Sequence, residues 1–564
     1  MTVSSFIRAG AKTDSWLVDM RLKLITAILL LAAATTVLAQ DGHTASESDT
    51  LDYVYLLNSD LIRFAKHINP DAQMLTGNVA FRHDSMYMYC DSAIFNQKGN
   101  SFEAYYNVRI EQGDTLFLFA DRLFYDGSTK MARVRDNVRV ENTSMILLTD
   151  SLNYDRNTGL GWFFDGGTLL DDESTLISEY GQFETATKYA TFMDGVSLES
   201  PDYKLTSDTL VYNTDSHTAF ITCPTTIESD GNLINTSRGQ FNTSTNDAIL
   251  LDRSVLTQNE GESRMVGDSI VYNKSDGLVS GFGDVLINYY KEKIDVKGEY
   301  VYYNENNDSA VVTGNALLIE YSAGDSMFVH ADTFRLASFY NEAHDTVVER
   351  HVRAFNKVRG YRVDLQMVAD SMLFTTKDSS LTMFVDPIVW SEGQQILGEK
   401  IVMYLNDSTI DWAHVIGQAL FVQRNDSVHY NQIAGREIKA YFHNGEIDHA
   451  NVIGNVMAIF YPLDADSTMI GMNTTEGSYL TTYFKMRSVD RILMTGHSSG
   501  VMYPMDKIDE NKMYLPDFKW FDRIRPVDRD DVFYWRGKRA DEQLKKSASG
   551  KEIPLPKLNL RNKQ

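Results

Sequence analysis

The chain has 564 residues with a formal net charge of −24, and it contains only 10 Pro and 2 Cys. A chain this acidic is repelled by a phosphate backbone, which excludes nucleic acid as a partner. The scarcity of Pro and the 23% of charged residues exclude a long disordered linker in the middle of the chain.

The chain begins with a segment that has the pattern of an export signal. Residues 20–23 are basic at Arg21 and Lys23, residues 24–34 are apolar, and Val37-Leu38-Ala39 fits a small-x-Ala processing site. We therefore predict an upstream extension and signal peptide over residues 1–39, a mature start near Gln40 and an N-terminal lead-in over residues 40–70.

A short motif then recurs through the chain at a nearly fixed spacing. It consists of Asp, a second residue that is usually Ser or Thr, a hydrophobic residue, any residue and an aromatic residue, and it begins at Asp91, Asp121, Asp150, Asp208 and Asp268. The first three copies are 30 and 29 residues apart, and degenerate copies fill the gaps up to about residue 505. A fixed period of this size indicates stacked supersecondary units with one shared core, which we assign to residues 71–505.

Each repeat is predicted to form two bent antiparallel strands. In the unit from Asp114 to Glu141, two apolar runs flank the turn residues Asp126-Gly127-Ser128. Positions −3 and −1 from the motif Asp are apolar or small, and positions +2 and +4 are apolar, so the inward-facing set changes phase at the Asp. Gly or Asn marks a second break in the other strand, as at Asp136-Asn137-Val138. The fold class is therefore all-β, an elongated β-jellyroll array of repeats about 29–30 residues long.

Creased strands that stack side by side enclose a trough with an apolar lining. From the phase of the repeat we predict its interior residues, whereas Asn153 is expected to point outward. The interior set is Leu118, Leu123, Tyr125, Leu147, Leu152, Tyr154, Leu205, Leu210, Tyr212, Met265, Ile270 and Tyr272. The pattern leaves open whether this trough is open or whether the two sheets close on each other to form an ordinary core.

The two cysteines and the C-terminal segment have separate interpretations. Cys90 and Cys223 lie more than four repeats apart, so we expect both to be free and mostly buried. Residues 506–564 lose the repeat and become rich in Lys, Arg and aromatic residues. We expect a cap on the last repeat followed by a disordered tail, and contact with a partner or an anionic membrane surface is the alternative.

The motifs that resemble catalytic or metal-binding sites do not favour an enzyme. Gly496-His497-Ser498-Ser499-Gly500 matches a nucleophile pattern, but a strand-forming run follows it where a helix is needed. The motif Asp recurs too often to be a catalytic acid, and the 12 His residues are not spaced as metal ligands. We predict no catalytic residue, no metal site and no cofactor.

The elements Leu75-Thr76-Gly77-Asn78-Val79 and Phe119-Ala120-Asp121-Arg122-Leu123 carry a family resemblance. They resemble the OstA/LptA-like periplasmic lipopolysaccharide-transport family, in particular its large OstA-like members of Bacteroidetes type. The resemblance implies a β-jellyroll, or β-taco, that shelters the acyl chains of lipid A while the sugars stay in water. It also implies a periplasmic protein, with association with the outer membrane as an option. Its partners would be other lipopolysaccharide-transport components of the inner and outer membranes, with end-to-end joining of copies as a further option.

Two other readings remain open from the residues themselves. A structural or adhesive cell-envelope β-solenoid that binds carbohydrate or protein predicts exposed aromatic ladders. A parallel β-helix lyase or hydrolase predicts single-strand rungs and a local Asp, Lys and Arg cluster.

Overall fold

The computed structural model describes residues 53–544, with gaps at 65–70, 114–115, 142–144, 171–173, 202, 214, 230, 243–244, 246, 292, 305, 322–323, 342–345, 407–409, 444–445, 465, 486–487 and 540–541. The predicted signal peptide and the end of the tail lie outside these residues. The chain divides into two compact units, with the boundary between Gly283 and Asp284 inside strand β21 (Leu278–Tyr289). We call them the N-terminal unit and the C-terminal unit.

The all-β prediction is confirmed, and the strands are antiparallel throughout the described pairs. The N-terminal unit contains β1 (Tyr55–Asn58), β2 (Leu61–Phe64), β3 (Ala72–His83), β4 (Met86–Asn96), β5 (Ser101–Gln112), β6 (Leu116–Asp126), β7 (Met131–Glu141), β8 (Ile146–Asp155), β9 (Leu160–Phe163), β10 (Gly167–Leu170), β11 (Thr175–Ser178), β12 (Tyr180–Glu184), β13 (Tyr189–Glu199), β14 (Lys204–Asn213), β15 (Thr218–Ile221), β16 (Thr225–Ser229), β17 (Asn232–Thr236), β18 (Arg238–Asn242), β19 (Ala248–Gln258), the 3-10 turn η3 (Asn259–Gly261) and β20 (Ser263–Asn273).

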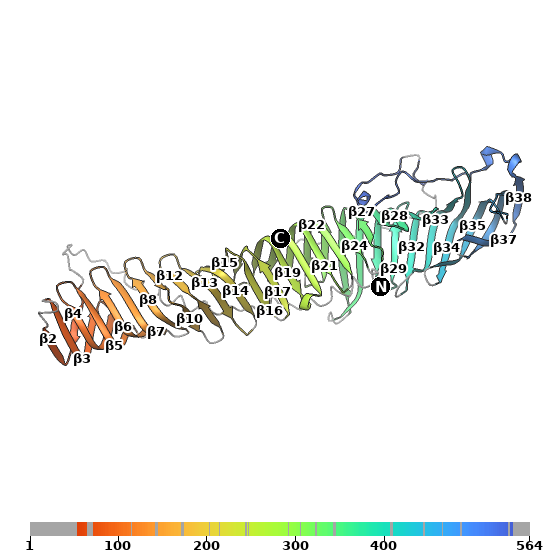
Figure 1. Cartoon of the computed structure of the whole chain (residues 1–564). Helices are drawn as coiled ribbons and strands as arrows, with labels where there is room; N and C mark the ends of the chain where they lie inside the picture. Colours follow the sequence, from red (N-terminus) through yellow and green to blue (C-terminus); the bar gives the residue numbers. More distant parts are fainter. Residues whose placement is uncertain are drawn as a thin grey trace, which may run out of the picture. The chain divides into compact units, whose positions relative to one another are not determined.

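The C-terminal unit continues the same pattern with some longer strands. It contains β22 (Ile294–Asn304), β23 (Ser309–Thr313), β24 (Leu317–Glu320), β25 (Met327–His330), β26 (Thr333–Tyr340), β27 (Val347–Arg362), β28 (Leu365–Thr375), β29 (Ser380–Phe384), β30 (Ile388–Ser391), β31 (Gln394–Leu397), β32 (Lys400–Leu405), β33 (Ile410–Arg424), β34 (Tyr430–His443), β35 (Glu446–Phe460), β36 (Gly471–Lys485), β37 (Ser488–Thr495), β38 (Ser499–Pro504) and the 3-10 turns η4 (Met505–Lys507), η5 (Glu510–Lys512) and η6 (Asp531–Phe533). Within each unit the strands lie side by side in chain order (Figure 1).

Long creased strands connect two half-sheets. Strand β8, for example, pairs through Ile146–Thr149 with β10 and through Asn153–Asp155 with β9. Strands β10 and β11 continue the first half-sheet, β9 and β12 continue the second, and both pairs rejoin at β13. The first half-sheet therefore contains the strand segments before the motif acid, and the second contains those after it. This arrangement agrees with the predicted two bent strands per repeat.

A β-bulge opposite the motif Asp produces the crease. In β7, Asp136 and Asn137 both have positive φ, and together they lie opposite Asp150 of β8. The backbone N–H of Asn137 donates to Oδ1 of Asp150 at 3.2 Å, and its Nδ2 donates to Asp121 at 2.6 Å. The repeated carboxylates therefore hold the bulges of neighbouring strands, and the extra residue sits in the strand that carries Gly or Asn.

Glycine is needed at several of these bulges because the neighbouring acid lies over the backbone. A Cβ on Gly283, whose φ is +73°, would lie 2.5 Å from the carboxylate of Asp268, and a Cβ on Gly417 would lie 2.6 Å from Glu399. No L side chain fits there without displacing the acid, which explains the recurring Gly before a Val or Ala.

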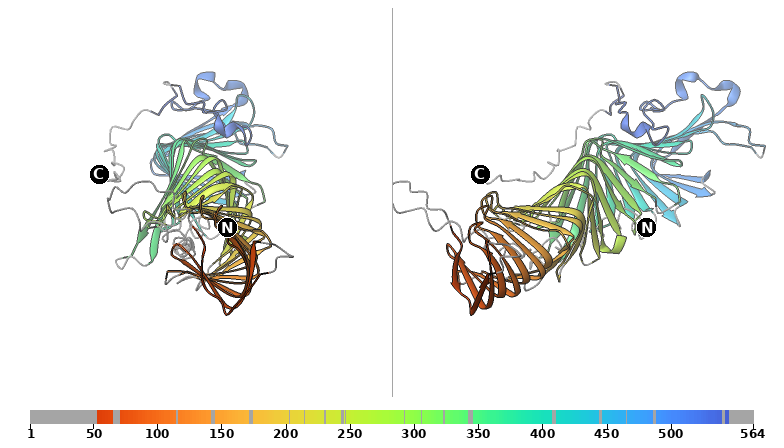
Figure 2. Two further views of the ribbon diagram at one scale, coloured as in Figure 1. Left: turned by 90° about the vertical axis from the view of Figure 1, so that its left-hand side faces the viewer. Right: turned by 60° about the vertical axis from the view of Figure 1, so that its left-hand side comes forward.

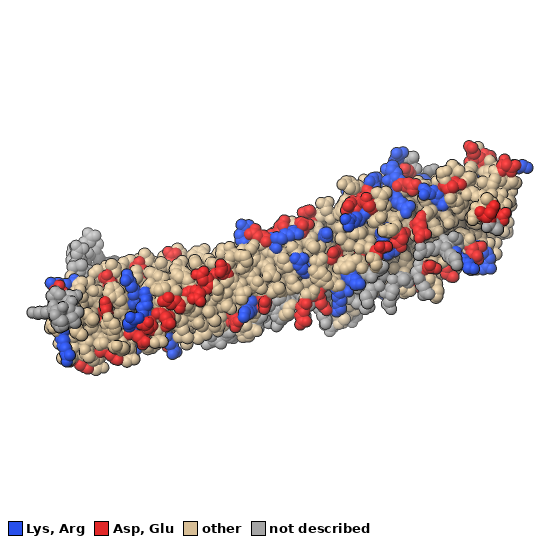
Figure 3. Space-filling view, in the orientation of Figure 1, with Lys and Arg blue, Asp and Glu red and all other residues tan. Residues whose placement is uncertain are grey.

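Apolar side chains fill the space between the half-sheets of the N-terminal unit. One cluster runs from Val54 to Val140 and a second runs from Phe163 to Tyr272. Charged side chains lie on the outside, separated by wide uncharged areas (Figure 3). The acidic charge of the chain is thus carried by solvated outer faces.

Both cysteines are free, as predicted. Cys90 is buried, and burial raises the pKa of its thiol to about 12. Cys223 is only half-buried, and its Sγ accepts the backbone N–H of Thr209 at 3.2 Å. Cys90 therefore has the packing role expected at the small position before the motif Asp.

The segment after β38 turns back along the outer face of the C-terminal unit, where it forms what we call the strap, residues 513–544. In Figures 1 and 2 its blue trace lies beside the strands of this unit. A cap on the last repeat was expected, whereas the aromatic residues of the strap pack on strands β28–β34. The segment thus covers a face that sequence patterning did not indicate.

Candidate functional site

The twelve predicted interior residues all lie at the apolar interface between the half-sheets of the N-terminal unit. Seven of them are buried members of the two clusters, and five are partly exposed and pack against the clusters. The buried ones are Leu123, Tyr125, Leu205, Leu210, Tyr212, Ile270 and Tyr272, and the partly exposed ones are Leu118, Leu147, Leu152, Tyr154 and Met265. The side chains face inward where the repeat indicated, and their lipid-binding role stays a prediction.

Much of this interface is closed in the structure. The Tyr125 ring is fully buried, and its hydroxyl group lies 2.5 Å from Nδ1 of His83, so the ring is fixed in place. Phe102 packs against the Tyr125 ring with a centroid distance of 5.7 Å. An apolar ligand can enter this part of the interface only if the half-sheets move apart.

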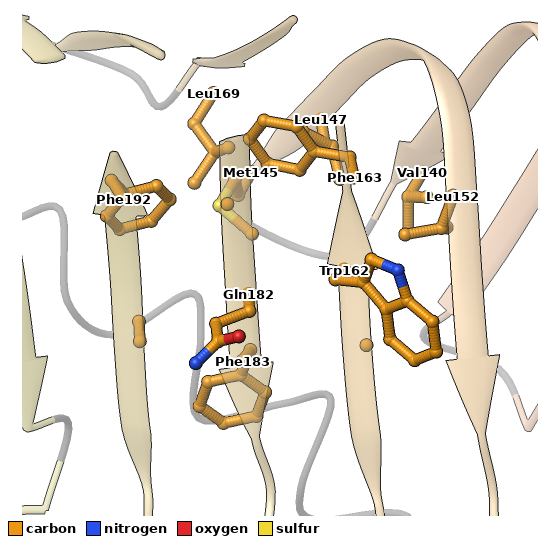
Figure 4. A pocket seen from close by; sticks show the side chains of 13 residues that line it. Val140, Met145, Leu147, Leu152, Trp162, Phe163, Leu169, Gln182, Phe183 and Phe192 are labelled. Carbon is orange, nitrogen blue, oxygen red and sulfur yellow. The ribbon is translucent and has the colours of Figure 1, made fainter. Parts of the chain in front are cut away.

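An apolar cavity of about 100 Å³ interrupts the packing between the two clusters. It lies where the long strand β8 gives way to the split strands β9, β10 and β12. Its lining consists of Val140, Met145, Leu147, Leu152, Gly161, Trp162, Phe163, Leu169, Gly181, Gln182, Phe183, Ala190 and Phe192 (Figure 4). Among the described lining residues, Gln182 alone has a polar side-chain amide or a charge. A pocket with such a lining favours apolar groups.

Three glycines shape the cavity by letting aromatic rings approach the backbone. A Cβ on Gly167 would lie 2.5 Å from the Phe163 ring, and a Cβ on Gly181 would lie 2.3 Å from it. The Phe163 ring therefore occupies a slot between two glycine backbones. Gly161 leaves similar room beside Tyr154, at 3.4 Å from its Cδ2. The position of the Phe163 ring depends on the absence of side chains at these sites.

The electrostatics of the cavity also favour apolar contents. Burial raises the pKa of the Tyr154 phenol, with a smaller opposing effect from Arg156, so this group stays neutral. Arg135 lies on the outer side of the same strands, where burial lowers the pKa of its guanidinium group. Within the part of the chain that the structure describes, no charged side chain lines the cavity.

Asn153 lies on the outer side of β8, as strand alternation predicted, but its side chain is only 8% exposed. The reason is that Arg135 lies over it and donates from Nη2 to Oδ1 of Asn153 at 2.9 Å, while its guanidinium group packs 5.1 Å from the Phe164 ring. A solvated outward position on β8 is instead Leu148, which is 39% exposed.

Sequence reasoning identified Leu147 and Leu152 but missed the aromatic half of the cavity lining. Phe163, Phe183 and Phe192 come from degenerate repeats in which Gly replaces the usual larger residue. The pair Gly167 and Gly181 on neighbouring short strands was the available signal, because isolated glycines inside strands indicate a close approach by another group.

The described residues contain no cluster of three or more His, Cys, Asp or Glu side chains with metal-binding geometry. Residues 499–504, which follow the Gly-His-Ser-Ser-Gly segment, form strand β38, so this segment lacks the helix that a nucleophile turn needs. Among the described residues no helix has the length and apolarity to cross a membrane.

Comparisons with known proteins agree with the resemblance found in the sequence. Residues 51–208 match a protein family described as OstA-like protein, and this range includes every residue of the cavity lining. Among solved structures the chain is similar to LptH, described as the LptA homologous periplasmic component of the conserved lipopolysaccharide transport device from Pseudomonas aeruginosa. That match has 16% identity and a TM-score of 0.16, and it covers 18% of this chain and 76% of LptH, so it carries no weight for function. No curated protein sequence matches the chain.

Proposed function

We propose that this chain, which is OstA-like over residues 51–208, is a periplasmic lipopolysaccharide-binding and transport protein. Its apolar interior would shelter the acyl chains of lipid A on the way to the outer membrane, while the sugars remain in water. The observation that carries the proposal is the apolar cavity between the half-sheets, inside the region that matches the family.

The physical basis of the proposal is burial of hydrocarbon. Each methylene group removed from water contributes roughly 0.8 kcal/mol, so even a short stretch of acyl chain in the cavity gives a measurable affinity. The repeat places similar apolar pairs on both sides of the cavity, as at Leu123 and Tyr125 or at Ile270 and Tyr272. These pairs are buried in the structure, so a lipid would move from the cavity to them only as the half-sheets move apart.

The exposed edges of the strands support the proposed partners. At the N-terminal edge, β1 and β2 each pair with β3, and Leu61, Ile62 and Phe64 are exposed on β2. At the C-terminal edge, β37 and β38 both pair with β36, and Val501 and Met502 are exposed on β38. Open strand edges with apolar side chains favour pairing with another chain. These edges suit other lipopolysaccharide-transport components of the two membranes or a further copy of this chain.

The periplasmic location rests on the family and on the export signal predicted over residues 1–39, which lies outside the described residues. Amino-terminal sequencing of the exported protein should find a start near Gln40. A soluble protein that still carries residues 1–39 would contradict this part of the proposal.

A displacement assay tests the proposed ligand directly. A fluorescent acyl probe should bind the purified protein, and lipopolysaccharide should displace it, because both ligands need the apolar interior. The matched control is the same lipopolysaccharide after chemical removal of its acyl chains, which should not compete. Equal competition by the deacylated form would contradict the proposal and favour recognition of the sugar.

The second candidate is a structural or adhesive envelope protein, which one observation favours. Half-buried rings form a ladder across strands β32 to β36, from Tyr404 through Trp412, Tyr441 and His449 to Tyr483. Tyr404 and Trp412 stack at 4.2 Å with an angle of 8° between their planes. Rings stacked in this way turn their faces toward one another, so they stabilise neighbouring strands and leave little ring face for a sugar. Lipid transport therefore remains the better supported function.

A further inference from the structure

The strap covers an apolar face that is exposed at the same repeat position elsewhere. In the N-terminal unit, the residue two positions before the motif Asp is 37% exposed at Phe119 and 39% exposed at Leu148, although Val266 near the end of this unit is only 5% exposed. In the C-terminal unit the corresponding residues Val368 and Leu397 are only 6% and 1% exposed. The outer face of the first half-sheet has therefore become a second core, made of Val368, Ile388, Trp390, Leu397, Leu420, Val422 and residues of the strap.

Buried glutamines on this face bind the main chain of the strap. Gln432 donates from Nε2 to the carbonyl of Met513 at 2.8 Å and accepts the N–H of Leu515 at 2.9 Å. Gln395 repeats the arrangement with the carbonyl of Lys519 at 2.8 Å and the N–H of Phe521 at 2.9 Å. Each amide thus joins residues i and i+2 of the strap, as a neighbouring β-strand would.

The two glutamines bind only main-chain atoms of the strap, and other residues of the face contact its side chains. Gln395 stands four positions before Glu399, and Gln432 stands four positions before Arg436, which takes the place of the acid opposite the bulge at Gly454, so the sites recur along the face. Their side chains are fully buried, and a buried amide without partners would be costly. The face is therefore built to hold the main chain of the strap at two places.

The strap supplies apolar side chains at every third position. Leu515, Phe518, Phe521 and Ile524 all pack into the cluster on this face, and Phe521 and Ile524 are buried. Tyr430 of β34 contacts the rings of Phe518 and Trp520 at centroid distances of 5.2 and 5.6 Å. Turns set this spacing, because the N–H of Phe518 donates to the carbonyl of Leu515 at 2.9 Å and the N–H of Arg525 donates to the carbonyl of Asp522 at 3.3 Å.

The far end of the strap is held by ionic contacts. Arg359 of β27 lies 3.2 Å from Asp531, both side chains are buried, and Arg536 also binds Asp531 with Nη1 at 2.7 Å. Lys538 donates to the carbonyl of Asp386 at 2.8 Å and lies 5.1 Å from the Phe521 ring. Along its length the strap is therefore held first by hydrogen bonds to its backbone and by apolar contacts, and then by ion pairs at Asp531.

The connection between β38 and the strap includes the 3-10 turns η4 and η5, neither of which contains a buried residue. Its partly exposed Met505 and Ile508 pack against the cluster of Ile459, Tyr461 and Met472. The two glutamine contacts and the buried Phe521 and Ile524 lie beyond this connection, which serves as a tether that raises the effective concentration of the strap.

We propose that the outer face of β28–β34 is a peptide-binding groove and that the strap is its tethered ligand. The ligand class is a segment with turns that place apolar residues at every third position, recognised through its main chain by Gln395 and Gln432. The same segment of a second copy fits the groove equally well, so the strap can be exchanged between copies when the tether is cut.

The test uses the full-length protein with a specific protease site inserted between Asp509 and Glu510 in the exposed connection. After cleavage the two fragments should elute together in gel filtration, because the contacts of the strap persist. A fluorescein-labelled peptide of residues 513–539 should then replace the resident strap, with saturable binding seen by fluorescence anisotropy. Fragments that separate at once, or a resident strap that the peptide never replaces, would overturn the proposal.

Variants of the strap peptide and of the face of β28–β34 test where the peptide binds. Peptides with Phe521→Ser or Ile524→Ser should bind at least roughly tenfold more weakly, and they avoid any question of protein folding. In the protein, Gln432→Leu should weaken binding roughly ten- to a hundredfold, because Met513 and Leu515 lose their partners. Gln240→Leu, at an exposed position on β18, is the matched control and should leave binding unchanged. Equal binding by all these forms would also overturn the proposal.

Discussion

A charge placed in the cavity should block lipid binding without unfolding the protein. Leu152 lines the cavity and packs against the first cluster, and Leu148 lies on the opposite face of the same strand. We therefore compare Leu152→Asp with Leu148→Asp. The two variants have the same charge and composition, and they carry the carboxylate on opposite faces of β8, on the two sides of its crease.

The magnitude follows from the environment of Leu152. Loss of a half-buried Leu side chain costs about 1.5 kcal/mol, and partial desolvation of the new carboxylate adds about 2 kcal/mol. A domain has a free energy of unfolding of about 5–15 kcal/mol, so the variant should still fold. An acyl chain that enters must also desolvate the carboxylate completely, which should weaken binding by roughly a hundredfold or more. Leu148→Asp should change stability by about 0.5 kcal/mol and leave binding intact.

The assay is displacement of a fluorescent acyl probe by lipopolysaccharide, with circular dichroism and protease resistance to show that both variants are folded. We expect the parent to have the highest affinity for lipopolysaccharide. Leu148→Asp should have nearly the same affinity, and Leu152→Asp a much lower one. A folded Leu152→Asp variant that binds like the parent would refute the reasoning, because the cavity would then lie off the lipid path.

Three further outcomes are expected. Gly181→Ala should displace the Phe163 ring, since the new Cβ would lie 2.3 Å from it, and should lower the free energy of unfolding by about 1–3 kcal/mol in denaturant titrations. An unchanged midpoint would show that the ring is free to move. Cys90 should resist alkylation in the native protein at pH 8, because its pKa of about 12 leaves almost no thiolate, and fast labelling would contradict this. The affinity for the labelled strap peptide should increase as the pH rises from about 8 toward the ordinary pKa of a lysine side chain. Burial lowers the pKa of Lys538 to about 8, so the bound state holds fewer protons than the free state in that range. The Lys538→Met peptide should lose this pH dependence.

The repeat made the creased strands and their inner faces predictable. The three-residue step between Ala120 and Leu123 required a change of phase, and the structure has a bulge at that level with Asp121 beside it. Both flanking residues are buried as the pattern indicated. Local spacing was sufficient here because each strand pairs with its neighbours in the sequence.

The strap was not predictable in the same way because its contacts join distant residues. Gln395 and Phe521 are 126 positions apart, and no local pattern connects them. One signal was present, since Ile388, Val389 and Trp390 form an apolar run with side chains on both faces of the strand. Such a run indicates a strand covered on both sides, and it distinguishes this region from strands with one solvated face. The burial of Asn153 was hidden for a similar reason, because it depends on the long side chain of Arg135 from the next strand.

Photocrosslinking in living cells tests the central claim most directly. A photoreactive amino acid at Leu152, inside the proposed lipid path, should form an adduct with lipopolysaccharide. The same amino acid at Leu148, on the outer face of the same strand, should not. Equal labelling at both positions, or labelling at Leu148 alone, would contradict the account of an internal lipid path.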